Sequence, residues 1–124
     1  MNILNAMEEF RIQRYLLVAG INVDTPFDKK GLETSMATEW MKANFPLIHA
    51  DRQKTYSILS TSKVDWTLVR VTFIEFKNDD AEIRVSLEDC PGKRINAGCI
   101  AGFLTTQLKV DTYCKKSPFI ANKE

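Results

Sequence analysis

The sequence predicts an α/β protein, in which helices cover both faces of a mostly parallel β-sheet. Two short apolar runs, residues 14–20 and 66–71, have the composition of strands buried on both faces. Segments with the apolar spacing of helices precede the first run and separate it from the second. Parallel neighbours need a crossover connection, which is usually a helix, so this order of elements predicts a parallel sheet.

Size and composition limit the class of protein. A chain of 124 residues is expected to form one domain, residues 1–124, around a single core. Its formal net charge of +1 gives no general attraction for nucleic acid or an acidic membrane, so neither is expected as a partner. No apolar run approaches the roughly 20 residues of a membrane span. Acids near the N-terminus, where a signal peptide carries basic residues, favour a cytoplasmic location.

The cysteines and the histidine do not form a recognisable site in the sequence. Cys90, Cys99 and Cys114 are odd in number and widely spaced, which fits neither a disulfide framework nor a metal site. We therefore predict reduced thiols and no metal ion. The single histidine, His49, is assigned no catalytic role, because a lone histidine at a helix start is more often structural.

The first two predicted elements are a helix and a strand. Ile3, Met7 and Phe10 lie at spacings of four and three, which predicts an amphipathic helix over residues 2–11. The run RYLLVAG, residues 14–20, is too short for most helices and ends in glycine. It is therefore predicted to be a buried parallel strand.

A loop and a second helix follow. Residues 21–31 contain a proline and end in a glycine, both of which break regular structure. Met36 and Trp40 predict a short helix over residues 33–45, with Pro46 ending it.

A third helix is predicted to lead into the second apolar strand. Asp51 is a candidate N-cap, and the helix would run to about Thr61. Its spacing turns Tyr56 and Leu59 toward the core.

The remaining elements are a strand, a helix and a strand. Apolar residues alternate with polar ones over residues 82–87, which predicts a strand with one solvent-facing side, followed by a turn. Asn96 is a candidate N-cap for the last helix. The apolar side of that helix is predicted to carry Ile100, Phe103, Leu104 and Leu108. A strand over residues 118–121 closes the chain.

Arg70 is the first candidate for a functional side chain. It ends the apolar run within VDWTLVRVTFIE, residues 64–75, and in open α/β sheets ligands bind just outside the carboxyl ends of the strands. Its guanidinium could bind a phosphate, a ribose or a carboxylate. The alternative is a salt bridge to a neighbouring acid. At the end of the other predicted strand, Ala19, Gly20 and Asn22 would let a planar ring approach the backbone, or would simply form a turn.

Several segments resemble one family over nearly the whole chain. These are NILNAMEEFRIQRYLLVAGINV, YSILSTSKVDWTLVRVTFIE, EIRVSLEDCPGKRINAGCIAGFLTTQL and SPFIAN. They are similar to the distal half of atypical short-chain dehydrogenase/reductases of the NAD(P)H-binding, NmrA-like type, a group that includes NADH-flavin reductases and biliverdin-IXβ reductases. The resemblance implies a partial Rossmann-like three-layer fold, NAD(P)H as the family cofactor, and a planar, flavin-like acceptor.

The resemblance also suggests site residues and differences. Val71, Thr72 and Phe73 match the family's nicotinamide-facing loop, whose backbone could hold a carboxamide; the alternative is an ordinary strand exit. Ala19 and Gly20 stand where the family has a hydroxyl pair, and Val71 stands where it commonly has proline. Tyr56 lacks the lysine four residues later that accompanies the catalytic tyrosine of classical members. No catalytic residue is assigned.

The family's first four strands and glycine-rich phosphate loop have no counterpart in this sequence. We therefore expect a truncated product or a natural short relative, which binds NAD(P)H weakly or not at all. Two functions remain open: the substrate-side portion of an NAD(P)H-dependent flavin-type reductase, inactive as this chain alone, or a non-catalytic binding or oligomerisation module. Residues 14–20 carry no lysine, proline or bulge signal that protects a sheet edge, so self-association through that edge is expected.

Overall fold

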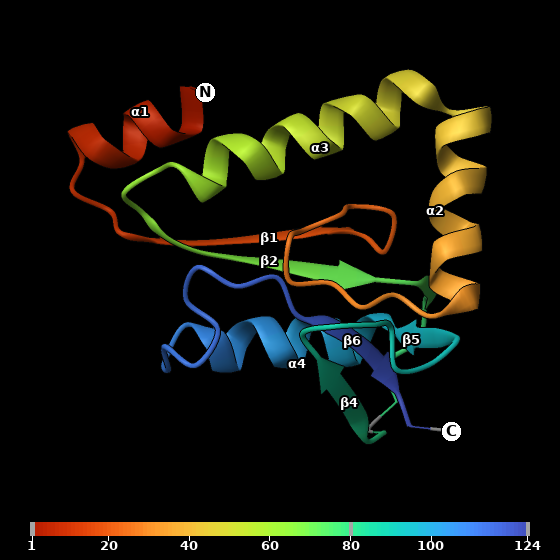
Figure 1. The fold of residues 1–124 in the computed structure, drawn as a ribbon. Coiled ribbons are helices and arrows are strands. Elements are labelled where there is room, and N and C mark those ends of the chain that lie inside the picture. The colour runs from red at the N-terminus through yellow and green to blue at the C-terminus, as the bar shows by residue number, and fades with distance from the viewer. Residues whose placement is uncertain (1, 80, 124) are drawn as a thin grey trace.

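A computed structural model of the chain describes residues 2–79 and 81–123 (Figure 1). The helices are α1 (Asn2–Glu9), α2 (Leu32–Asn44), α3 (Pro46–Ser60) and α4 (Ala97–Gln107). The strands are β1 (Arg14–Gly20), β2 (Asp65–Val71), β3 (Phe73–Glu75), β4 (Ile83–Ser86), β5 (Arg94–Asn96) and β6 (Phe119–Asn122). No helix among the described residues is long and apolar enough to cross a membrane.

The main sheet has four strands in the order β1-β2-β6-β4. β1, β2 and β6 run parallel, and β4 joins β6 antiparallel at one end. The short strands β3 and β5 form a separate parallel pair. The predicted α/β class with a mostly parallel sheet is therefore confirmed.

Helices cover both faces of this sheet (Figure 1). α1 and α3 lie over one face, α4 lies under the other, and α2 stands beyond the carboxyl ends of β1 and β2. The core under α3 includes Tyr56, Leu59 and Leu68. The core above α4 includes Val69 and Phe103. Successive side chains of β2 thus enter opposite cores, as the pleat of a strand requires.

The third helix begins five residues earlier than predicted. Pro46 is its first residue, so the proline that we expected only to end α2 also starts α3. Proline suits the first helical position, because the N–H that it lacks would have no partner there and its φ is already helical. The Asp51 cap was therefore wrong, and Asp51 lies inside the helix.

The apolar faces of α1 and α2 differ from the prediction. On α1, Met7 is buried, but Ile3 and Phe10 are exposed. On α2, Met36 and Trp40 are exposed, and the buried positions are Thr34 and Thr38. α2 stands at the end of the sheet instead of lying on it, so polar neighbours can satisfy its inner face. For example, the Lys30 ammonium donates to the Thr38 hydroxyl at 2.9 Å.

The last third of the chain follows the prediction with two changes. The Asn96 side chain caps α4 and accepts from the Cys99 N–H at 2.8 Å. Leu108 is exposed instead of buried, because α4 ends at Gln107 and Leu108 is its C-cap. The single apolar run of residues 64–75 is divided at Thr72 between two sheets, β2 and β3.

Candidate functional site

The carboxyl ends of β1 and β2 open into a cleft of about 490 Å³, here called the strand-tip cleft. Three segments line it: Ile21 and Thr72 at the strand tips, residues 31–34 and Ala37 at the start of α2, and Asp89, Cys90, Gly92 and Lys93 after β4. This is the edge where open α/β sheets bind their ligands.

The structure brings the two predicted groups of site residues together at this edge. Ala19 lies opposite Arg70, and Gly20 lies opposite Val71, in the parallel register of β1 and β2. The Ile21 N–H continues the pairing by donating to the Val71 carbonyl at 3.1 Å. Of the predicted residues, Thr72 lines the cleft, Val71 is buried and Phe73 is exposed. Their assignment to a cofactor stays a prediction.

Asn22 is held inside the protein. Its side-chain amide is buried and lies 3.2 Å from Nδ1 of His49, which is buried too. The same side chain occupies the space beside Gly20, where an added Cβ would lie 2.5 Å from the Asn22 Oδ1. Gly20 therefore makes room for Asn22 in this structure.

Arg70 is fully buried, and its guanidinium makes five contacts within the chain. Nη1 donates to the Asp28 carboxylate at 2.8 Å and to the Val23 carbonyl at 2.9 Å. Nε and Nη2 both donate to the Ser117 carbonyl, at 2.9 and 2.6 Å. The guanidinium carbon also lies 3.6 Å from the centre of the Phe119 ring. The salt bridge that we set against ligand binding is thus present.

Asp28 is fixed as firmly as its partner. Its carboxylate accepts from the Thr25 N–H at 2.9 Å and from the Thr25 hydroxyl at 2.7 Å. Its side chain is only 8% exposed. Arg70 and Asp28 together fasten the loop after β1 and the segment before β6 to the middle of β2. The pair therefore has a structural role, which is to hold three distant segments in place.

The charges of the strand-tip cleft do not suit a pyrophosphate. Asp89 lies beside the N-terminus of α2, where an added Cβ at Gly31 would lie 2.8 Å from its Oδ2. Glu33 follows in the first turn of that helix. A helix N-terminus attracts one anion, and here carboxylates already hold that position. Lys93 is the single basic side chain in the lining. The cleft fits an uncharged ring or carboxamide better than a phosphate.

Sequence reasoning missed the part of the cleft that comes after β4. Asp89 and Lys93 lie in the turn EDCPGK, which was predicted only as a turn. Their approach to α2 depends on contacts across 58 or more positions of sequence, and no local pattern signals it. Among the described residues, no cluster of three or more His, Cys, Asp or Glu side chains could hold a metal ion.

The fold and the cleft together define a class. A parallel sheet with helices on both faces and a cleft beyond its carboxyl strand ends is the arrangement of Rossmann-like nucleotide-binding domains. More specifically, the chain belongs to the NAD(P)H-binding family, whose pattern matches residues 1–111.

Solved structures share this fold at low sequence identity. ChuY from E. coli CFT073 is 16% identical with a TM-score of 0.76, and the match covers 98% of this chain and 59% of that one. ChuY from E. coli O157:H7, described as an anaerobillin reductase, is 14% identical with a TM-score of 0.76, covering 98% and 56%. A short-chain dehydrogenase/reductase from Veillonella parvula in complex with NADP is 14% identical with a TM-score of 0.65, covering 97% and 55%.

These likenesses confirm the Rossmann-like fold. The chain spans between half and three fifths of the length of each of these structures. No curated protein matches the sequence.

Proposed function

We propose that this chain supplies the substrate side of an NAD(P)H-dependent flavin-type reductase of the atypical short-chain type. The observation that carries the proposal is the strand-tip cleft, which lies at the ligand-binding edge of a fold whose family binds NAD(P)H. In such a protein the cofactor would donate a hydride to a planar acceptor, and the chain would supply position instead of an acid or a base.

The residues of this chain would serve the nicotinamide end of the cofactor. The backbone at Gly20, Val71 and Thr72 borders the cleft and could hold a carboxamide, with Ala19, Asn22, Arg70 and Phe73 completing the strand tips. Arg70 would act there through its backbone, because its guanidinium is engaged inside the protein. The sequence contains no glycine-rich phosphate loop. The chain alone is therefore expected to be inactive, as a truncated member would be, and a cytoplasmic location belongs to the same proposal.

Titration with two ligands tests this proposal. Reduced nicotinamide mononucleotide, at millimolar concentration, should shift the NMR signals of the Gly20, Thr72 and Phe73 amides. Calorimetry with NADH and NADPH should give no micromolar Kd, because nothing here binds the pyrophosphate. The variant Ala37→Trp, which narrows the cleft from α2, should abolish the shifts. Unmoved strand-tip amides would contradict the cofactor assignment, and a micromolar Kd would contradict the predicted weak binding.

A second candidate function is a non-catalytic oligomerisation module. The observation that favours it is the position of β1, which ends the described sheet with Val18 at 37% exposure. A strand with an unpaired edge is a template for another strand. The self-association that this implies is tested with the other predictions in the Discussion.

A further inference from the structure

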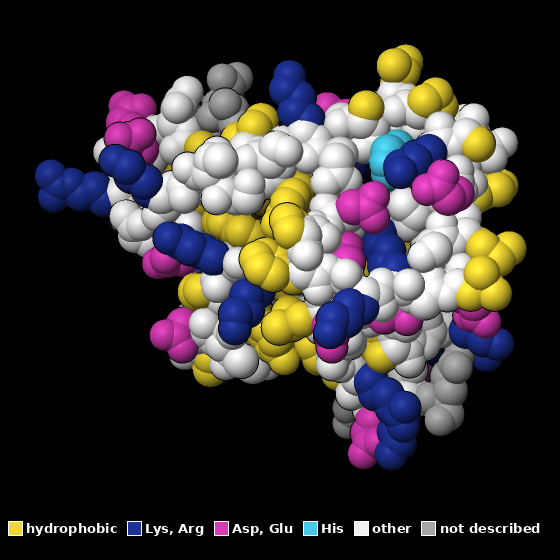
Figure 2. Space-filling model, viewed as in Figure 1, with side chains coloured by type: hydrophobic (Ala, Val, Ile, Leu, Met, Phe, Trp, Pro, Cys, Tyr) yellow, Lys and Arg dark blue, Asp and Glu magenta, His cyan; other side chains and the backbone are white. Residues whose placement is uncertain are grey.

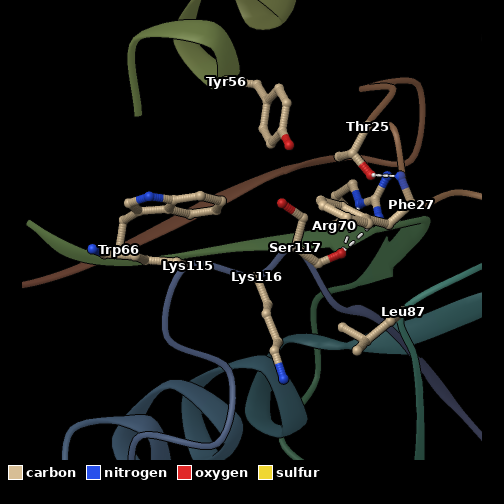
Figure 3. A pocket seen from close by; sticks show the side chains of 9 residues that line it. All are labelled: Thr25, Phe27, Tyr56, Trp66, Arg70, Leu87, Lys115, Lys116 and Ser117. Atoms are coloured by element: carbon tan, nitrogen blue, oxygen red, sulfur yellow. Dashed lines mark hydrogen bonds between the residues drawn. The ribbon is translucent and has the colours of Figure 1, made fainter. Parts of the chain in front are cut away.

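A second cavity lies on a face of the sheet, away from the strand tips. It has a volume of about 240 Å³ and is here called the Trp66 pocket. Trp66 of β2 and Ser117, just before β6, form its floor, and Tyr56 of α3 lies over them (Figure 3). Phe27 and Leu87 close the other side. It shares no lining residue with the strand-tip cleft.

Aromatic and aliphatic side chains make up the walls of the Trp66 pocket. Tyr56 and Trp66 pack edge to face, with ring centres 5.9 Å apart and planes at 88°. Phe27, at 74% exposure, stands at the open side. Figure 2 shows hydrophobic side chains gathered in a hollow below α3, with basic side chains beside it. Such walls suit an aromatic ring, because aromatic groups pack well at these angles.

One buried polar atom in this pocket has no partner. The Ser117 residue is 8% exposed, and its Oγ makes no hydrogen bond with any described residue. The Ser117 carbonyl is held by Arg70, so the backbone cannot turn this hydroxyl away. In Figure 3 the hydroxyl points into the cavity, toward the phenol of Tyr56. A buried hydroxyl without a hydrogen bond is unfavourable, and a ligand acceptor in the cavity would satisfy it.

The rim of the Trp66 pocket is basic. Lys115 and Lys116 line it, both are exposed, and within the described residues neither lies within 4.0 Å of a carboxylate. Arg70, below them, is already neutralised by Asp28. Burial raises the pKa of the Tyr56 phenol, against the opposing effect of Arg70, so Tyr56 keeps its proton near neutral pH and can donate it in a hydrogen bond. The unpaired positive charge favours a ligand with an anionic group.

The lysines reach this position through an unusual turn. Lys115 has a φ of 60°, in the left-handed region that L-residues other than glycine rarely adopt. Its N–H donates to the Trp66 carbonyl at 2.6 Å, which holds the turn against β2. The turn therefore fixes two lysine backbones and Ser117 directly beside Trp66.

We propose that the Trp66 pocket binds a small aromatic carboxylate. The ring would lie between Phe27, Tyr56 and Trp66, and the carboxylate would face Lys115 and Lys116 and accept from the Ser117 hydroxyl. The cavity is smaller than the roughly 300–1,000 Å³ of pockets for drug-sized ligands, so one or two fused rings are expected. The proposal does not depend on the reductase function, because the site lies away from the strand-tip cleft.

NMR titration with 2-naphthoate tests the site. The chain has two tryptophans, so its two indole N–H signals report on two places. The Trp66 signal should move with a Kd below a millimolar, whereas Trp40, exposed on α2, should stay in place. The neutral probe 2-naphthalenemethanol should bind at least fivefold more weakly. An unmoved Trp66 signal, or equal affinity for both probes, would overturn the proposal.

Variants separate recognition from folding. Lys116→Met should weaken 2-naphthoate at least threefold and leave the neutral probe unchanged, whereas Lys109→Met, which removes the same charge outside the pocket, should change neither. Ser117→Ala should weaken 2-naphthoate about threefold without lowering the Tm, because the hydroxyl contributes no hydrogen bond to the fold. Equal effects of the two lysine variants would show general charge attraction and contradict a built site.

Discussion

β1 and β2 are neighbouring parallel strands of seven residues, yet their surroundings differ. Every residue of β2 from Trp66 to Val71 is buried, whereas no residue of β1 is fully buried and Val18 is exposed. β2 lies between two strands and under helices of both faces; β1 has one described neighbour. The difference teaches that an apolar composition makes a strand, but position in the sheet decides what its residues contribute. Four predictions follow the comparison in order of decreasing effect on stability.

The largest effect is expected from Arg70 in β2. Arg70→Met should lower the free energy of unfolding by about 3–5 kcal/mol, because it leaves the buried Asp28 carboxylate without its charge partner. Urea denaturation measures the loss. Arg52→Met, which removes an exposed arginine paired with Asp51, is the matched control and should cost less than about 1 kcal/mol. A loss below about 1 kcal/mol for Arg70→Met would instead support a ligand-binding role for the guanidinium.

Leucines in the two strands provide the second test. Leu68 in β2 is 1% exposed, whereas Leu16 in β1 is only half-buried. Leu68→Ala should cost about 2–5 kcal/mol, because it leaves a cavity in the core. Leu16→Ala should cost clearly less. Equal losses in thermal denaturation would mean that the face of β1 is covered in solution, and the contrast between the strands would then be wrong.

The third test loosens the helix that covers one face of β2. Asn96→Ala removes the side-chain cap of α4 and should cost about 1 kcal/mol. Asn44→Ala, at the exposed end of α2, removes a similar amide that donates to the Trp40 carbonyl. It should change stability by less than about 0.5 kcal/mol. Circular dichroism during urea denaturation compares the two, and an equal cost would show that the α4 cap contributes nothing beyond a surface hydrogen bond.

Local patterns predicted the elements that depend on local chemistry. The run RYLLVAG predicted β1 with the bounds that the structure has, and the Asn96 cap was visible because capping involves only the next three residues. β3 and β5 were missed, since three residues are too few to show a period. The α3 boundary was wrong because Pro46 serves two helices in opposite ways.

The sites were harder to predict, because distant segments build them. The end of β2 was correctly identified as an edge of the strand-tip cleft, since the carboxyl ends of parallel strands meet there. The partner of Arg70 is 42 positions away in sequence. The Trp66 pocket combines a loop, a helix and three strand flanks, and its basic rim depends on a left-handed residue that nothing in the sequence indicates.

The smallest effect on stability, and the clearest effect on assembly, is expected from Val18 in β1. We propose that two copies pair antiparallel through the free edge of β1. A two-fold axis at Leu17 would place Leu16 against Val18, Tyr15 against Ala19, and Arg14 against Gly20. Large side chains then face small ones, no like charges meet, and the sheet continues across the dimer. Val18→Lys puts a charge at this seam, as natural edge strands do. It should leave the free energy of unfolding within about 0.5 kcal/mol and turn a dimer into a monomer in sedimentation velocity at micromolar concentration. Ile48→Lys, on the exposed side of α3, adds the same charge elsewhere and should leave the dimer intact. A parent protein that sediments as a monomer while the amides of residues 16–19 resist hydrogen exchange would show that the edge is covered within the chain, and would rule out this dimer.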